Sequence, residues 1–392
     1  MRVLHIIPSV SHIRGGTSRA VLDMVNSLQT HGINAEIATT NDDGNSTLDV
    51  LLEKRVLFCN APTYFFPRFS SSISALQEFS FSSSFTIWLL QNISQYDLIH
   101  VHALFSYPST IAMTIARLRG IPYITTPHGL LCHWSLQQST QKKRAYLNII
   151  EQANLNHSYA LHLTSKQEER DVLSLQFRTP TFTLPLGLAV VPALVSSAHT
   201  RLRQLLNCPL DEPIILFLSR LHHKKGLNYL IPALAKLTDH RFTLVIAGSG
   251  TLEYEAEIES MLSLAQIRDR THLVGFIEGE TKDLFLQGSD LFTLTSHSEN
   301  FGVAVLEAWA AGLPVLLTPG VALASVAQEH NLGYVSELEV NAIMKTLTYY
   351  LSHQAEAKAM GDRARQFILE NYTWDKIAVQ MKQVYIDILK NH

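Results

Sequence analysis

Residues 2–40 read RVLHIIPSVSHIRGGTSRAVLDMVNSLQTHGINAEIATT, and this stretch decides the fold class. An apolar run at residues 3–7 is typical of a buried strand, and a glycine pair leads into an amphipathic helix predicted at residues 17–31. The apolar run at residues 35–40 predicts the next strand. Strand, glycine loop, helix and strand form a βαβ unit, and such units build parallel sheets.

The same rhythm recurs along the chain. Further strands are predicted at residues 98–102, 123–126, 213–218, 242–247, 272–276, 290–294 and 314–317. Runs that are apolar on both sides are typical of strands covered by helices on both faces. The pattern weakens at residues 182–195, where prolines and a glycine cluster, and we expect a hinge there. The sequence therefore predicts an α/β protein with two doubly wound, Rossmann-like domains and a cleft between them, with ligands beyond the carboxyl ends of the strands.

Composition excludes several classes of protein. A chain of 392 residues with 46% hydrophobic residues is too long for one ordinary core and apolar enough for two or three, which excludes disordered and collagen-like sequences. Its net charge of −3 gives no field to recruit a polyanion, so it disfavours a dedicated nucleic-acid binder. Cys59, Cys132 and Cys208 lie far apart and predict neither a disulfide framework nor a zinc site, as in a reducing compartment.

Targeting segments are not evident. The first apolar run is too short for a signal peptide. The uncharged stretch at residues 308–327 is interrupted by prolines and glycines, whose backbone neighbours would be unsatisfied in lipid, and we interpret it as buried helix, turn and strand. We expect a cytoplasmic protein, with contact at the inner face of the membrane left open.

Two carboxylates stand eight residues apart in residues 298–308, SENFGVAVLEA, where a strand leads into a helix at about Gly302. If both were near-helical, Glu299 and Glu307 would lie about 12 Å apart along the axis, within reach of one elongated ligand. The helix amino terminus between them suits a diphosphate, and the carboxylates suit hydroxyls of a sugar and a ribose. Alternatively, Glu299 caps the helix and Glu307 forms a salt bridge.

A basic turn occupies residues 219–226, SRLHHKKG, between a predicted strand and a predicted helix. Arg220, through its guanidinium fork, and Lys225, as a point charge, are suited to clamp a pyrophosphate. The alternative is a solvated surface turn, and we interpret the histidine pair within it as solvated rather than metal-binding.

Together these motifs resemble family 4 of the retaining glycosyltransferases, of the bacterial polysaccharide-biosynthesis type, which have the GT-B fold. The resemblance covers nearly the whole chain and rests on the basic turn, the Glu-x7-Glu segment, Ala247-Gly248-Ser249-Gly250, Gly15-Gly16, Pro127-His128-Gly129 and the segment YTWDKIA at residues 372–378. It implies an acceptor-binding domain at residues 1–185, a nucleotide-sugar-binding domain at residues 186–372, and a final helix at residues 373–392 that crosses back to the first domain. Pro185-Leu186-Gly187 departs from the Pro-Asn-Gly common in the family, so any contact made by that Asn is in doubt.

The resemblance implies four catalytic residues, namely His128, Glu299, Arg220 and Lys225. Arg220 and Lys225 would bind the donor diphosphate and stabilise its charge as it leaves. Glu299 would hold hydroxyls of the donor sugar, and His128 would lie near that sugar. A lone histidine in a Pro-His-Gly turn is otherwise often structural.

It also implies a wider donor-binding set, in which Glu307 accepts from the ribose. The other members would act through backbone atoms: Gly16 toward the diphosphate from the opposite domain, Gly275, Phe276 and Ile277 toward the base, and Asn300, Phe301 and Gly302 toward the sugar.

The chemistry that this implies is retaining transfer of a hexose. The leaving diphosphate gains negative charge, so fixed positive charge beside it is the useful contribution. The sequence has no Asp-x-Asp motif, and we expect neither a metal nor a cofactor. UDP-glucose is the favoured donor, and a lipid-linked or polysaccharide glycan is the expected acceptor.

Residues 64–88 hold eight aromatics that either cover the core or form a lip contacting the acceptor or a membrane: Tyr64, Phe65, Phe66, Phe69, Phe79, Phe81, Phe85 and Trp88. The basic run Lys142-Lys143-Arg144 lies nearby in a predicted helix. Net charge is +2 over residues 1–190 and −5 over residues 191–392, which is the sign expected if the first domain faces anionic lipid.

Three alternatives are weighed against this function. A sugar-phosphate-dependent synthase of the same fold predicts a basic cluster in the first domain, where only Arg14 and Arg19 occur near the glycine loop. An NAD-dependent oxidoreductase predicts Gly-x-Gly-x-x-Gly after the first strand, and that spacing is missing. A non-catalytic nucleotide-sugar-binding subunit would have lost Arg220, Lys225 or Glu299, and all three are present.

Overall fold

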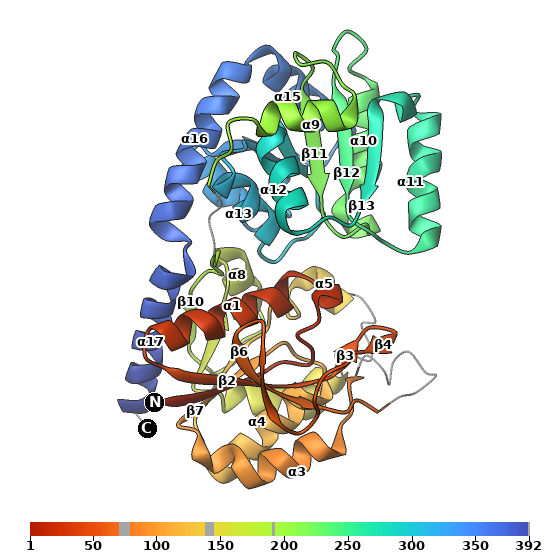
Figure 1. Cartoon of the computed structure of the whole chain (residues 1–392). Coiled ribbons are helices and arrows are strands. Elements are labelled where there is room, and N and C mark those ends of the chain that lie inside the picture. Colours follow the sequence, from red (N-terminus) through yellow and green to blue (C-terminus); the bar gives the residue numbers. More distant parts are fainter. Residues whose placement is uncertain (70–78, 138–144, 190–192, 391–392) are drawn as a thin grey trace. The chain divides into compact units, whose positions relative to one another are not determined.

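The computed structural model describes residues 1–69, 79–137, 145–189 and 193–390 (Figure 1). The chain divides into two compact units. Unit 1 comprises Met1–Ala189 and Trp374–His392, and unit 2 comprises Val190–Thr373. The basic run predicted at residues 142–144 lies outside the described residues.

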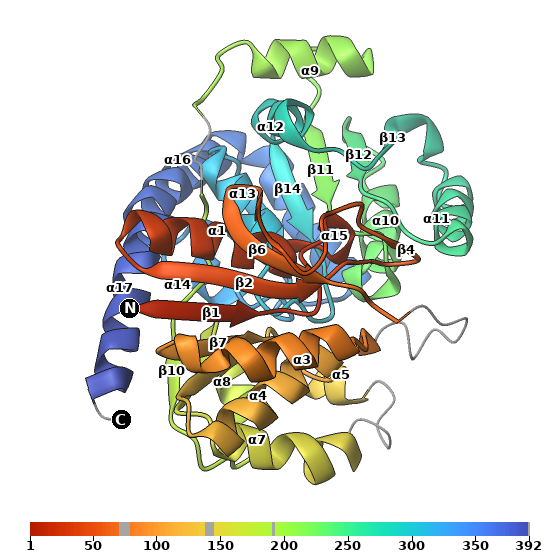
Figure 2. The same ribbon diagram turned by 60° about the horizontal axis from the view of Figure 1, so that its bottom comes forward.

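Unit 1 is built on a sheet whose strands follow the order β10-β9-β8-β7-β1-β2-β6-β5. Their bounds are β1 (Arg2–Ile6), β2 (Asn34–Thr40), β5 (Arg55–Phe58), β6 (Ala61–Phe66), β7 (Leu98–His102), β8 (Tyr123–Thr126), β9 (Ala160–Leu163) and β10 (Thr181–Thr183). Each neighbouring pair is parallel except β5, which runs antiparallel to β6 at one edge. Figure 2 shows β1 between β2 and β7, so β1 is the point where the strand order reverses.

Helices on this sheet are α1 (Gly16–Thr30), α3 (Ser83–Asn92), α4 (Tyr107–Arg119), α5 (His133–Gln137), α7 (Gln152–Asn156), α8 (Lys166–Leu173) and α17 (Trp374–Lys390). Their ends follow from local chemistry: the Ser82 and Ser165 side chains cap α3 and α8, and Gly120 ends α4 in the left-handed conformation. The last helix, α17, lies along α1 within unit 1 (Figure 1).

Most of the aromatics at residues 64–88 line the core of unit 1 rather than its surface. Phe65, Phe66 and Phe85 are fully buried, and Trp88 packs on Tyr64 with ring centroids 4.7 Å apart. Two members differ: Phe69 is 57% exposed and Phe81 is 42% exposed, and these two rings lie 6.5 Å from each other. Covering the core is therefore the main role of the described part of this segment. Residues 70–78 are not among the residues that the structure describes.

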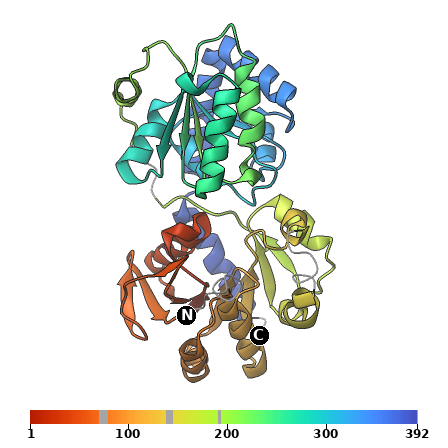
Figure 3. The same cartoon turned by 90° about the vertical axis from the view of Figure 1, so that its right-hand side faces the viewer.

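Unit 2 holds an all-parallel sheet with the strand order β13-β12-β11-β14-β15-β16. Its strands are β11 (Ile214–Leu218), β12 (Thr243–Ala247), β13 (Thr271–Gly275), β14 (Leu291–Leu294), β15 (Val315–Leu317) and β16 (Gly333–Val335). Its helices are α9 (Ala198–Leu206), α10 (Leu227–Ala235), α11 (Leu252–Leu264), α12 (Gly279–Gly288), α13 (Val303–Ala310), α14 (Ala324–Glu329), α15 (Val340–Ser352) and α16 (Gln354–Asn371). Helices lie on both sides of the sheet (Figure 3), so the predicted α/β class with two Rossmann-like domains is confirmed.

The strand order of unit 2 reverses between β11 and β14. In doubly wound sheets ligands bind beyond the carboxyl ends of the strands at this point. The uncharged stretch at residues 308–327 contains the end of α13 and strand β15, as predicted. Among the helices of the described residues, none combines the length and apolar character needed to cross a bilayer.

Candidate functional site

Three of the predicted catalytic residues come from loops at the carboxyl edge of the unit 2 sheet. Arg220 and Lys225 lie in the loop between β11 and α10, and Glu299 lies between β14 and α13. Gly275 ends β13 at the same edge. Because the strands are parallel and adjacent, residues far apart in the sequence meet here.

Backbone hydrogen bonds tie these loops to one another. Leu221 N donates to Ser249 O over 2.8 Å, which joins the loop after β11 to the loop after β12. Gly248 N donates to Gly275 O over 2.7 Å and continues the row to β13. The loops therefore form one continuous rim with a fixed spacing.

The loop after β14 is joined to this rim by a close approach that needs glycine. Gly226 has φ 72°, and a Cβ built there would lie 1.9 Å from Thr295 O. His297 N also donates to Lys224 O over 2.9 Å. These contacts bring the basic turn and the acidic segment together, and only glycine leaves space for them.

The two predicted charges of the rim form an ion pair. Lys225 Nζ contacts a carboxylate oxygen of Glu299, and the two side chains are 12% and 21% exposed. Arg220 is exposed, and within the described part of the chain it forms no ion pair. The rim thus combines the internally balanced Lys225–Glu299 pair with the exposed guanidinium of Arg220.

The segment around Glu299 is held by backbone pairing. Glu299 N donates to Gly320 O over 2.7 Å, and Glu299 O accepts from Ala322 N over 3.0 Å. Gly302, with φ 89°, then starts α13 without a side-chain cap. Glu299 is therefore not helical, and the axial separation expected from a helix joining it to Glu307 does not apply.

Asn300, Phe301 and Gly302 fill the turn between Glu299 and the first turn of α13. Phe301 is 3% exposed and its ring centroid lies 6.4 Å from that of Tyr372, so its side chain anchors the turn. The amides at the start of α13 lie at a helix amino terminus, where unpaired N–H groups favour an anion.

Glu307 has a partner that the sequence did not reveal. Lys282 Nζ, from α12, lies 2.7 Å from Glu307 Oε1, and both side chains are about one-quarter exposed. The salt bridge expected as the alternative role of Glu307 is therefore present. No motif marks Lys282, because its position opposite α13 depends on how two helices pack.

The residues predicted to contact a base differ in exposure. Gly275 has φ 69°, and a Cβ built there meets no atom of the described part of the chain within 4 Å. Phe276 is 58% exposed, and Ile277 is half-buried. An exposed aromatic ring directly after β13 is chemically suited to a planar ligand.

The other two predicted residues belong to unit 1. Gly16 is exposed and is the first residue of the 15-residue helix α1, whose first turn carries no acidic residue. His128 follows β8 and has φ 52°, a left-handed conformation that is rare outside glycine and clusters at functional sites. The next residue, Gly129, donates its N–H to Glu168 Oε1 over 2.5 Å, which fixes the turn.

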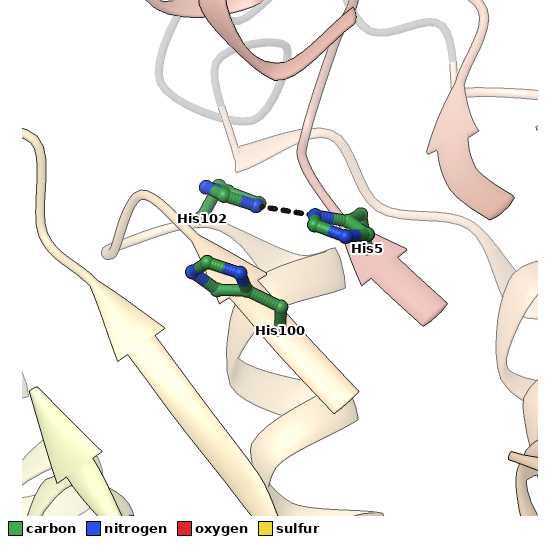
Figure 4. A group of neighbouring side chains, drawn as sticks. All are labelled: His5, His100 and His102. Atoms are coloured by element: carbon green, nitrogen blue, oxygen red, sulfur yellow. Dashed lines mark hydrogen bonds between the residues drawn. The ribbon is translucent and has the colours of Figure 1, made fainter. Parts of the chain in front are cut away.

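Four buried histidines lie close to one another in unit 1, and His128 is hydrogen-bonded to one of them, His102. His5, on β1, pairs in register with His100 on β7, and His102 lies two residues further along β7 (Figure 4). Residues two apart on a strand share one face, and this spacing is the signal that was available. His162, on β9, completes the group, and all four are fully buried.

Ring nitrogens of His5, His100 and His102 lie within 4.8 Å of one another. Such a spacing allows a metal ion, but the nitrogens are engaged otherwise. Both nitrogens of His100 and of His102 have hydrogen-bond partners, and His5 Nδ1 lies 3.0 Å from His102 Nε2. These rings are therefore arranged as hydrogen-bonded chains.

Comparison with known proteins agrees with this arrangement. Residues 199–367 match the family described as glycosyl transferases group 1, and residues 15–187 match the glycosyl transferase 4-like domain. A glycosyltransferase of Methanocaldococcus jannaschii is 26% identical over 302 residues, which cover 75% of this chain and 76% of that protein.

Solved structures show the same fold over the full length. The sucrose-phosphate synthase of Thermosynechococcus elongatus superimposes with a TM-score of 0.81 at 22% identity, covering all of both chains. The Anabaena protein HepE, solved with UDP-glucose, gives a TM-score of 0.78 at 18% identity over 99% of this chain and all of that one. With both halves of the chain matched and the fold shared throughout, the protein belongs to family 4 of the glycosyltransferases and has the GT-B fold.

Proposed function

We propose that this glycosyltransferase moves a hexosyl group, with glucose favoured, from a UDP-sugar to a lipid-linked or polysaccharide glycan, with retention of configuration and without a metal. The observation that carries the proposal is the rim of unit 2, where Arg220, Lys225 and Glu299 meet at the carboxyl ends of adjacent parallel strands. The complex of HepE with UDP-glucose, a protein of the same fold, supports the choice of donor.

In the proposed mechanism the rim recognises the donor by its charge. Arg220 and Lys225 bind the diphosphate, and the amino terminus of α13 adds partial positive charge. As the glycosidic bond breaks, the leaving diphosphate gains charge that these groups stabilise, which makes a divalent cation unnecessary. An oxygen of the leaving diphosphate then takes the proton of the acceptor hydroxyl, on the same face of the sugar ring that this hydroxyl attacks.

Glu299 has two proposed roles in this sequence. In the absence of donor it neutralises Lys225, and with donor bound it accepts hydrogen bonds from sugar hydroxyls. A negative phosphate that draws Lys225 toward itself would release the carboxylate for the sugar. Glu307 receives the ribose hydroxyls, and the backbone at residues 275–277 receives the base.

The synthase alternative is disfavoured by the partners of two arginines. Arg14 Nε lies 2.7 Å from Asp42 Oδ2, and Arg19 Nε lies 2.9 Å from Asp23 Oδ2. Both guanidinium groups are therefore engaged with carboxylates, which reduces their attraction for an acceptor phosphate.

The test is nucleotide release from UDP-, GDP- and ADP-sugars with and without EDTA. We expect one sugar nucleotide to be hydrolysed slowly, insensitively to EDTA, and the activity to be lost in Glu299→Ala and Lys225→Ala. Lys236→Ala is the matched control, since Lys236 pairs with Asn341 on the surface away from the rim. Loss of activity with EDTA would contradict the metal-free mechanism. Donor binding by calorimetry without turnover on any glycan acceptor would favour a non-catalytic binding subunit.

A further inference from the structure

Two hydrogen-bonded chains run through the buried histidines of unit 1. The first joins His128 Nε2 to His102 Nδ1 over 3.1 Å and His102 Nε2 to His5 Nδ1 over 3.0 Å (Figure 4 shows the second bond). The second joins Tyr385 to His100, Thr126, His162 and the carbonyl of Leu184 over 2.7, 2.7, 2.9 and 2.8 Å. The direction of hydrogen-bond donation is fixed in the second chain, because it ends on a carbonyl group that can only accept. The first chain has no such end.

The proton positions of the second chain are fixed by the Leu184 carbonyl, which can only accept. His162 must carry its proton on Nε2, so its Nδ1 accepts from the Thr126 hydroxyl. The Thr126 oxygen then accepts from His100 Nε2–H, and His100 Nδ1 accepts from the Tyr385 hydroxyl. Every member is satisfied in one direction, so this chain has a single tautomeric state.

The first chain permits two directions, which differ at their buried end. His5 Nε2 is fully buried and has no hydrogen-bond partner among the residues that the structure describes. If protons pointed inward, this atom would be an unpaired N–H group; if they point outward, it is an unpaired lone pair. Unpaired buried donors are the rarer and costlier case, so the outward direction is favoured. In that direction His128 Nε2 accepts, and its proton resides on Nδ1.

We propose that His102 and His5 are positioning residues that hold neutral His128 with its proton on Nδ1, so that His128 meets its ligand as a hydrogen-bond donor. The His128 Nδ1–H group would donate its hydrogen bond to an oxygen of the sugar nucleotide, either a sugar hydroxyl or a phosphate oxygen. This part of the proposal rests on the proposed function. The left-handed backbone of His128 and the hydrogen bond of Gly129 to Glu168 keep the ring in reach of His102.

The rings in this chain are neutral at physiological pH. Burial, with a smaller contribution from His162, lowers the pKa of both His5 and His128 to about 3. The pKa of His102 is also lowered by burial, and its neighbours His5 and His128 add to the effect. The tautomer, rather than the charge, therefore decides what His128 offers to a ligand.

The test is nitrogen-15 NMR of the histidine rings in the full chain without ligand, with the His128 signals assigned from His128→Gln. We expect Nδ1 of His128 to be protonated, which is the minor tautomer of a neutral histidine side chain in water. Protonated Nε2, or stoichiometric zinc in the protein as purified, would overturn the proposal. Because this measurement needs no substrate, it stands or falls separately from the proposed function.

Variants on β7 separate positioning from packing. His102→Phe should let the His128 tautomer relax and lower the rate of nucleotide release about tenfold or more. His102→Asn, whose amide can occupy the place of Nδ1–H, should restore much of it. The matched control is His100→Phe, equally buried on the same strand, which should leave the His128 tautomer unchanged. An unchanged tautomer in His102→Phe, or an equal change in His100→Phe, would refute the positioning role.

Discussion

At the scale of single residues, the rim of unit 2 sets two carboxylates in different electrostatic surroundings. Glu299 is paired with Lys225 between two loops, whereas Glu307 is paired with Lys282 between two helices. The sequence places Lys225 and Glu299 in one site but does not predict that they pair with each other, since this contact depends on how the loops after neighbouring strands meet. A salt bridge is the alternative role that the sequence indicates for Glu307, but its partner Lys282 could not be predicted, since helix-to-helix contacts have no local signature.

Replacing Glu307 by Gln should affect binding more than chemistry. The amide keeps the shape of the side chain but weakens its bond to ribose hydroxyls, so KM for the donor should rise about tenfold with kcat little changed. Steady-state kinetics of nucleotide release checks this. Lys282→Met is the comparison: its partly exposed pair is worth about 1 kcal/mol or less, so the change in KM should stay within about fivefold. A fall in kcat with constant KM would assign Glu307 a role in the transition state.

Replacing Glu299 by Gln should reduce kcat. A neutral amide accepts more weakly from sugar hydroxyls and no longer pairs with Lys225, so kcat/KM should fall about 10- to 100-fold. The same assay of nucleotide release measures it, with Glu257→Gln as a control on an exposed carboxylate. Activity close to that of the unmodified chain would remove Glu299 from the proposed mechanism.

At the scale of elements, the sequence predicted the buried strands that apolar periodicity marks. It did not predict features that depend on which strands pair with one another. Apolar runs such as residues 214–218 have no polar face, so they could only be strands covered on both sides. The edge strand β5 went unpredicted, because its alternation between exposed and half-buried residues is short and weak. The histidines of β7 were visible in the sequence, but their chains depend on register between strands that lie far apart along the polypeptide.

The glycine of the basic turn should be indispensable to unit 2. In Gly226→Ala the new methyl group would collide with Thr295 O, in addition to the usual cost of a left-handed alanine of about 1–2 kcal/mol. Gly312→Ala is a matched control, with φ 76° but no atom of the described residues within 4 Å of the added Cβ. We expect Tm to fall several degrees further in Gly226→Ala than in Gly312→Ala. Equal shifts in Tm would show that the loops holding Gly226 and Thr295 can move apart without a loss of stability.

The Tyr385 hydroxyl, on α17, should contribute measurably to the stability of unit 1. In Tyr385→Phe the buried acceptor His100 Nδ1 loses its donor, which should lower the free energy of unfolding by about 1–3 kcal/mol. Tyr349→Phe, whose hydroxyl meets Glu356 on the surface, should cost much less. Chemical denaturation followed by circular dichroism compares the two variants. Similar losses would mean that the Tyr385 hydroxyl bond carries no special weight.

At the scale of the whole molecule, the buried histidines predict how stability depends on pH. Burial lowers the pKa of His5 to about 3 and that of His162 to about 4, whereas the unfolded chain has ordinary values. Between these values the unfolded state binds more protons, so stability is lost as pH falls below about 6.5, by about 1.4 kcal/mol per pH unit for each such histidine. The midpoint of urea unfolding should therefore be lower at about pH 5 than at about pH 7.5. His162→Gln should lessen this dependence, and a midpoint that stays constant would contradict the expectation.

The return of α17 to unit 1 has a consequence for the order of events during synthesis. The ribosome completes Met1–Ala189 long before Trp374, so the emerging first unit lacks its last helix while all of unit 2 is made. Until then α1 has no α17 to pack against, and His100 lacks the Tyr385 hydroxyl. Unit 2 is thus inserted between two segments of unit 1, Met1–Ala189 and Trp374–His392. A nascent chain released before residue 374 would lack the contact of α17 with α1, and apolar surface exposed in this way favours aggregation.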